Sequence, residues 1–248
     1  MAANLARSSE SESPLSSFIG RHPRLLVLTG AGCSVASGIP EYRDHDGAWK
    51  SRPPVRYAEF VASAAVRRRY WARSVFGWER VAGAQPGAVH RALARLEQAG
   101  HARADMQALL LAWNGLFLAA LGAAPGATAA ARPDGEVQLE ADFSDFRVPD
   151  CPSCGGVLKP AVVFFGENVP RARVDATLCA LAAADALLVV GSSLMVFSGF
   201  RFCLAAREMG KPVAAVNLGR TRADELLSLK VASDCGPALE DVVDALGL

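Results

Sequence analysis

Short apolar runs alternate along the chain with longer stretches of helical periodicity. The apolar runs predict strands over Arg24–Thr29, Val157–Phe165, Ala186–Val190 and Pro212–Asn217. Helical patterns predict helices over 57–77, 89–99, 174–184, 200–209 and 237–246. This alternation favours the α/β class, with a doubly wound parallel sheet covered by helices on both faces.

The stretch from Met106 to Ala131 departs from this pattern because it contains no charged residue. Residues 106–124 approach the length and polarity of a membrane span. Asn114, Gly115 and Gly122 interrupt them, and neither a second span nor a basic flank accompanies them. We expect a helix that is buried or covered by a partner, with a membrane span as the weaker alternative.

Composition narrows the class of protein. A chain of 248 residues, 51% of them hydrophobic, is long enough for one large domain with a small insert. The net charge of +1 gives no field that would favour nucleic acid or anionic lipid as a partner. Six scattered cysteines favour a reducing compartment, the cytoplasm, with the mitochondrion as the alternative. Residues 1–20, rich in serine and without an apolar run, predict a disordered leader.

A glycine-rich loop follows the first predicted strand. Glycines let the backbone approach a diphosphate, and the start of the next helix offers free N–H groups to it. Arg43 adds a cation that matches phosphate geometry. The loop runs through Gly30, Ala31, Gly32 and Ser34, then Gly38, Ile39 and Pro40, then Tyr42, Arg43, Asp44 and Trp49. A tight strand-to-helix turn would explain its first glycines equally well.

Two later strands also end in small polar segments, Gly191-Ser192-Ser193 and Asn217-Leu218-Gly219. Ligands of doubly wound sheets bind at the carboxyl ends of the strands. Serine hydroxyls and an amide there suit phosphate and ribose, although each segment alone is more often a turn. Three such strand ends together favour a dinucleotide ligand.

These motifs resemble those of the sirtuin family of NAD-dependent protein-lysine deacylases. TGAGCSxxSGIPxYRDxxGxW (29–49), KPAVVFFGENVP (159–170), GSSLMV (191–196), VNLG (216–219) and Cys235 occur in the family order. The stretch 197–200, with Cys33, is similar to the class II, mitochondrial sirtuin 4-like branch. The resemblance implies NAD contacts at Gly30, Ala31, Gly32, Ser34, Gly38, Ile39, Pro40, Tyr42, Arg43, Asp44, Trp49, Gly191, Ser192, Ser193, Asn217, Leu218, Gly219 and Cys235.

The resemblance also implies a substrate, a reaction and a domain plan. Acylated-lysine proteins would add as a strand beside Val163, Phe164, Phe165, Gly166, Glu167 and Val196. The acyl oxygen attacks the nicotinamide ribose, nicotinamide leaves, and a histidine base activates a ribose hydroxyl. The implied domain is Rossmann-like over 21–248, with a zinc module and helical insert at about 103–160.

The chain departs from the family after Gly100. There the family has a strand, Gln-Asn-x-Asp, the catalytic His-Gly and a first Cys-x-x-Cys, whereas this chain continues HARADMQALLLAWNG. An internal block is missing, and the insert is therefore truncated. His22, His45, His90 and His101 all lie outside the catalytic context, so no catalytic residue is assigned.

The sequence allows two readings of the metal site and two of the activity. Cys151 and Cys154 supply only half of a tetrahedral zinc site, so a metal-free turn competes with zinc binding. The chain is either an NAD-dependent deacylase or a catalytically silent module that binds NAD or ADP-ribose. Association with a partner through its apolar helix rests on composition alone.

Overall fold

The computed structural model describes residues 13–98, 132, 144, 148, 150, 151 and 153–248. They contain a four-stranded sheet in which the order along the sheet, β1-β2-β3-β4, follows the chain and every pair is parallel. The strands are β1 (Leu25–Thr29), β2 (Ala186–Val190), β3 (Val213–Val216) and β4 (Leu229–Val231). The predicted parallel α/β architecture is confirmed.

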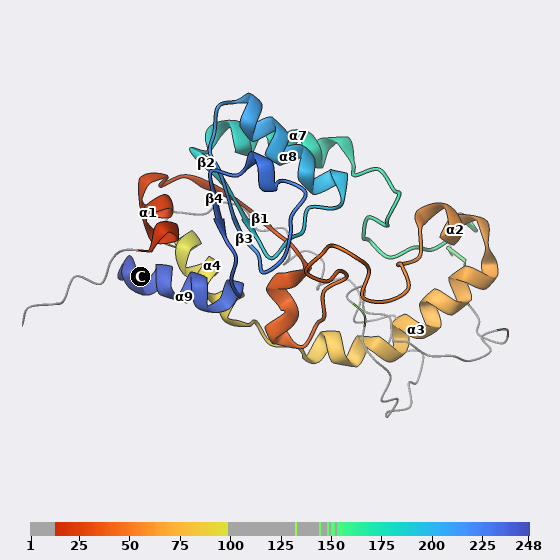
Figure 1. Cartoon of the computed structure of the whole chain (residues 1–248). Coiled ribbons are helices and arrows are strands. Elements are labelled where there is room, and N and C mark those ends of the chain that lie inside the picture. Colours follow the sequence, from red (N-terminus) through yellow and green to blue (C-terminus); the bar gives the residue numbers. More distant parts are fainter. Residues whose placement is uncertain (1–12, 99–131, 133–143, 145–147, 149, 152) are drawn as a thin grey trace, which may run out of the picture.

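Helices cover both faces of this sheet (Figure 1). One face carries α1 (Pro14–Arg21), α4 (Ala88–Gln98) and α9 (Cys235–Ala245). The other carries α7 (Arg171–Ala183) and α8 (Phe197–Glu208). Because both faces are covered, β2 is a continuous apolar run rather than an alternating one.

The core divides between the two faces by the two-residue period of the strands. Leu188 and Val190 of β2 pack with the α1, α4 and α9 side chains, whereas Leu187 and Val189 pack with those of α7 and α8. All four are 0% exposed. Full burial of each such side chain stabilises the fold by about 1.5–3 kcal/mol, which makes β2 the centre of the structure.

A smaller cluster lies between α2 (Tyr57–Ala62) and α3 (Ala64–Gly83), where Phe60 and Tyr70 pack on Phe164. The sequence predicted one helix here. The structure breaks it at Ser63, whose extended backbone ends α2 and whose side chain accepts the Val66 amide at the start of α3. A serine that caps the second helix explains the break.

Two predictions of the sequence are corrected. Residues 157–165 form no strand and make only one bridge, from Phe165 to Arg56. The predicted disordered leader is wrong for residues 14–20, which belong to α1. Ser13 caps that helix, Pro14 opens it, and Leu15, Phe18 and Ile19 are buried at helical spacing.

The predicted helix within Met106–Ala131 and the first twelve residues lie outside the described residues. Among the helices that the structure does describe, none has the length and apolarity to cross a membrane.

Candidate nucleotide site

The glycine loop after β1 forms a 3-10 helix, η1 (Ala31–Ser37), at the carboxyl edge of the sheet. The Gly30 amide donates to the Val190 carbonyl at 2.9 Å, and the Gly32 amide donates to the Gly191 carbonyl at 2.9 Å. These bonds lock the first loop to the end of β2. The two glycine amides are therefore engaged within the protein and do not serve a ligand.

The glycines are required by the closeness of these two loops. A Cβ on Gly30 would lie 2.5 Å from the Gly191 oxygen and 2.6 Å from Ser192 Cβ. Gly191 itself has φ +60, and a Cβ there would lie 2.6 Å from the Cys33 nitrogen. A side chain at Gly30 or Gly191 would push the loops apart.

Free donors at this edge come from the neighbouring residues. The amides of Ala31, Ser192 and Ser193 make no hydrogen bond to any described residue. The Ser192 hydroxyl accepts the Leu194 amide at 3.3 Å. Three unpaired N–H groups from two interlocked loops form a donor set suited to an anion.

Residues 42–50 fold into a tight loop around Asp44. Its Oδ1 accepts the Asp46 amide at 3.0 Å and the Ala48 amide at 2.8 Å. Arg43 lies over the Trp49 ring, 3.8 Å from its centroid, and donates to the Gly47 carbonyl at 2.7 Å. The predicted phosphate-binding cation thus stabilises its own loop in this structure.

This loop rests on the segment that follows β3. The Arg220 amide donates to the His45 carbonyl at 2.8 Å. A Cβ on Gly219 would lie 2.4 Å from that same carbonyl oxygen, so glycine is required for the contact. The Asn217 side-chain N–H donates to the Gly219 carbonyl at 3.0 Å. The Oδ1 of Asn217 has no partner among the described residues.

The structure therefore brings three predicted groups together at one edge: the glycine loop, Gly191–Ser193 and Asn217–Gly219. Gly38 ends η1 in the left-handed conformation with φ 82, and the Ile39 amide donates to the Ser34 carbonyl at 3.2 Å.

The predicted peptide segment 163–167 reaches the Tyr42–Trp49 loop through Phe165. The centroid of the Phe165 ring lies 5.4 Å from that of Tyr42 and 5.5 Å from that of Trp49.

Val163 and Val196, predicted to lie beside the substrate peptide, are 37% and 44% exposed. Phe164 is buried instead, and Glu167 accepts the Phe164 amide at 2.8 Å and pairs with Lys159 at 3.2 Å. The Phe165 carbonyl accepts the Tyr57 amide at 3.0 Å. The segment offers exposed apolar side chains, but within it only Phe165 takes part in a β-bridge.

Two buried thiols lie behind the nucleotide edge. Cys33 Sγ donates to the Val190 carbonyl, and Cys235 Sγ donates to the Val216 carbonyl, each at 3.2 Å. Burial raises the pKa of Cys33 to about 12 and that of Cys235 to about 11. Both groups are neutral at physiological pH and act in this structure as small packing residues.

One contact at this edge was not foreseen from the sequence. His90 Nε2 lies 3.5 Å from the Ser34 hydroxyl, while its Nδ1 accepts the Gly87 amide at 3.0 Å. Burial lowers the pKa of His90, and the neighbouring Arg91 lowers it further. The sequence predicted a helix over 89–99, and no sequence signal linked that helix to Ser34.

The other histidines lie in different settings. His22 Nδ1 is 2.7 Å from the Phe18 carbonyl at the end of α1. The His45 side chain is exposed on the loop described above. His101 lies outside the described residues.

Cys151 and Cys154 lie in a turn closed by the Gly155 amide on the Cys151 carbonyl at 2.8 Å. Within the described ranges, no group of three or more His, Cys, Asp or Glu side chains comes together as metal ligands. Tetrahedral zinc needs four ligands, and these residues supply two. The described residues do not fit a zinc ion, and the predicted zinc module is not supported by them.

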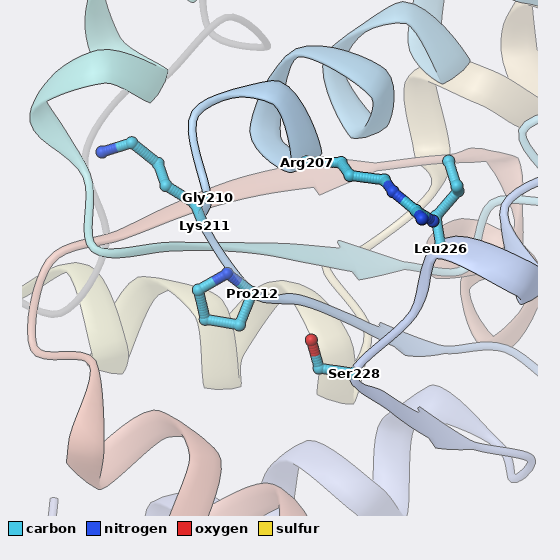
Figure 2. A pocket seen from close by; sticks show the side chains of 6 residues that line it. All are labelled: Arg207, Gly210, Lys211, Pro212, Leu226 and Ser228. Atoms are coloured by element: carbon cyan, nitrogen blue, oxygen red, sulfur yellow. The ribbon is translucent and has the colours of Figure 1, made fainter.

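A shallow hollow of about 320 Å³ lies at the opposite edge of the sheet (Figure 2). Arg207, Gly210, Lys211, Pro212, Leu226 and Ser228 line it. Pro212 and Ser228 immediately precede β3 and β4, so the hollow is at the amino ends of the strands. It is therefore separate from the candidate site.

A parallel sheet with glycine loops and free amides at its carboxyl edge defines the class of nucleotide-binding α/β proteins. The Sir2 family model matches residues 30–107 and 129–198. The chain belongs to this family.

The chain is similar in sequence to several NAD-dependent deacetylases and deacylases along most of its length. An NAD-dependent protein deacetylase of Bordetella bronchiseptica is 48% identical, over 92% of this chain and 96% of the relative. One of Xanthomonas axonopodis is 50% identical, over 91% and 88%. The NAD-dependent protein deacylase Sirt4 of Drosophila melanogaster is 37% identical, over 93% and 86%.

Solved structures show the same fold. A Sir2 enzyme, solved to explain the mechanism and regulation of such enzymes, has a TM-score of 0.67 at 26% identity, over 94% of this chain and 96% of that one. A Sir2 homologue in complex with ADP-ribose has a TM-score of 0.67 at 25% identity, over 94% and 97%.

The alignment with the Bordetella protein is longer than the part of this chain that it covers. It spans 264 positions, whereas 92% of the 248 residues of this chain is about 228 residues. About 36 aligned positions therefore have no residue in this chain.

Proposed function

We propose that this chain has the architecture of an NAD-dependent protein-lysine deacetylase and that it binds NAD at the carboxyl edge of its sheet. One observation carries the proposal: the interlocked loops present the free amides of Ala31, Ser192 and Ser193 beside Asn217. The names of the bacterial relatives, which are NAD-dependent protein deacetylases, support the same activity.

The residues present fit a dinucleotide. The three free amides would bind phosphate oxygens, and Asn217 Oδ1 would accept a hydrogen bond from a ribose hydroxyl. Bound NAD would supply the electrophilic ribose carbon that accepts the acyl oxygen. The Tyr42–Trp49 loop, fixed by Asp44 and by the stacked Arg43, would cover the nucleotide and exclude water.

The proposed substrate is an acylated-lysine protein. Its backbone would lie along Val163–Glu167 and Val196, where exposed valines allow many substrate sequences. The sirtuin 4-like, class II assignment belongs to this proposal. The motif around Phe197–Phe200 supports it, whereas the bacterial deacetylases are more similar overall than the Drosophila Sirt4 protein.

A second candidate is an NAD- or ADP-ribose-binding module without turnover. The roughly 36 unmatched alignment positions favour it, because the family's catalytic histidine is expected in the missing block. His22 and His90 are hydrogen-bonded in structural roles, and neither is placed beside the proposed peptide segment by any described contact. A general base must lie within hydrogen-bond reach of its proton.

Two measurements on the full chain separate the candidates. A rise in melting temperature with millimolar NAD and ADP-ribose would establish the nucleotide site. Release of nicotinamide in the presence of an acetyl-lysine peptide would establish the deacetylase, and a thermal shift without release would establish the silent module. Absence of any thermal shift for folded protein would refute both.

A further inference from the structure

Two arginines share one exposed aromatic ring at the start of α8. Arg201 Cζ lies 5.4 Å from the centroid of Phe197, and Arg222 Cζ lies 5.8 Å from it. Arg222 also lies 4.5 Å from the centroid of Phe200. Phe197 is 53% exposed, so this pair of cations on a ring, which we name the arginine–phenylalanine patch, faces solvent.

The charge of the patch is not neutralised within the described part of the chain. Neither arginine has an ion pair with a described carboxylate. Asp224, two residues beyond Arg222, is engaged by Lys230 at 2.7 Å and by the Thr221 hydroxyl at 2.6 Å. Two positive charges on one ring, without a carboxylate of the chain beside them, favour the binding of an anionic ligand.

The arginines also have hydrogen-bonding capacity left. Arg201 Nε is buried and has no hydrogen-bond partner among the described residues, which is unusual for a guanidinium donor. Arg222 makes one long side-chain bond, to the Met195 carbonyl at 3.4 Å. The amides of Phe197 and Ser198, at the uncapped start of α8, make no hydrogen bond to a described residue and add to the positive potential.

The place of the patch identifies the ligand. Val196, immediately before α8 and 44% exposed, is one of the residues proposed to pair with the substrate backbone. A peptide bound there would carry its neighbouring side chains past Arg201 and Arg222. We propose that the arginine–phenylalanine patch binds the carboxylate of an aspartate or glutamate that flanks the acylated lysine. This specificity rests on the proposed deacetylase function.

The test measures peptide binding by fluorescence anisotropy, because binding does not require turnover. Two acetyl-lysine peptides of equal length are compared on the full chain, one with glutamates on both sides of the lysine and one with glutamines. We expect the glutamate peptide to bind roughly tenfold more tightly at ~50 mM salt, and this preference to shrink at ~500 mM salt.

Variants then assign the preference to the patch. Arg222→Gln and Arg201→Gln should reduce it to roughly twofold or less, and Arg222→Lys, which keeps the charge, should retain part of it. Arg207→Gln is the matched control. Arg207 also belongs to α8, but it lines the hollow at the amino ends of the strands, away from the patch. Each variant is first checked for an unchanged melting temperature and an unchanged shift with NAD.

Equal binding of the two peptides, or an equal loss in Arg207→Gln, would overturn the inference while leaving the deacetylase proposal intact. A smaller NAD shift in the Arg201 or Arg222 variants, with the peptide preference unchanged, would assign the arginines to the nucleotide and overturn it as well. If neither peptide binds although NAD does, both this inference and the proposed substrate fail.

Discussion

The candidate nucleotide edge and the segment 163–167, which we propose to bind the peptide, are held in different ways. At the candidate nucleotide edge, backbone bonds from Gly30 and Gly32 fasten one loop to another, and β2 and β3 below are fully buried. The segment 163–167 makes one bridge and is anchored by the Phe164 ring and the Glu167–Lys159 pair. Direct backbone contact tolerates almost no substitution, whereas side-chain anchoring tolerates many.

The largest effect should come from Gly30→Ala. The added methyl group would meet the Gly191 oxygen at 2.5 Å, and both partners are backbone fixed by the sheet. We expect a loss of about 3–4 kcal/mol in the free energy of unfolding, together with loss of the NAD thermal shift. Urea denaturation and the thermal shift measure the two effects.

Gly20→Ala is the matched control for this change. Gly20 lies in α1 with no atom within 4 Å of an added Cβ, so alanine should stabilise the chain by about 0.5–1 kcal/mol. Equal stability of the two variants would show that the close loop contact does not exist in solution.

A smaller, more local effect is expected from Phe164→Ala. Phe164 is 8% exposed and packs in the small cluster with Phe60 and Tyr70 rather than in the main core, so its removal should cost about 3 kcal/mol. Hydrogen exchange should quicken in α2 and α3 and stay unchanged in β2. The exposed neighbour Val163→Ala should change little, and faster exchange throughout β2 would mean that the two regions are coupled.

Asp224→Asn tests the ion pair and hydrogen bonds that Asp224 makes with Lys230 and Thr221. Burial opposes ionisation of Asp224, but hydrogen bonds from Lys230 and Thr221 outweigh it and hold the pKa below its ordinary value of 3.8. The network therefore stabilises the fold above that value, and its contribution is lost as the pH falls through the lower folded-state pKa.

We expect a deficit in unfolding free energy of up to about 1 kcal/mol at pH 7, shrinking in acid. Urea midpoints of the parent and of Asp224→Asn, compared from pH 7 down to pH 3, measure this. A deficit that grows in acid would contradict the assigned roles of Lys230 and Thr221.

The smallest perturbation is chemical labelling, which leaves the chain unmutated. Burial raises the pKa of Cys33 to about 12 and of Cys203 and Cys235 to about 11, so these thiols should react only after unfolding. Cys154 and Cys179 are exposed and should react first. Mass spectrometry after brief alkylation at pH 8 identifies the sites, and early modification of Cys33 would mean that the nucleotide edge opens readily.

The strands that line the nucleotide edge were predictable, and those at the margins were not. Ala186–Val190 was predicted to the residue because a strand buried on both faces is apolar throughout. The three residues of β4 are only half-buried and give no such run. Val157–Phe165 has the composition of a strand but no neighbouring strand in the described structure to pair with, and composition cannot reveal that.

The candidate site shows a similar division. The sequence identified the three strand-end segments because each follows an apolar run. It named glycines and their neighbours together as NAD contacts and could not say which amides are free. The structure pairs the Gly30 and Gly32 amides with Val190 and Gly191, and it leaves the amides of Ala31, Ser192 and Ser193 without a partner among the described residues. Which carbonyl lies opposite an amide depends on a partner 160 positions away, and local pattern carries no information about it.

The pairing of β1 with β2 has a consequence for biosynthesis. Leu25 meets Ala186, so the first strand leaves the ribosome long before its neighbour in the described sheet exists. At about 5–20 residues per second, that interval is roughly ten to thirty seconds. During this time the nascent chain exposes an apolar strand without a partner, and chaperones that hold apolar segments would protect it until Val190 has been added.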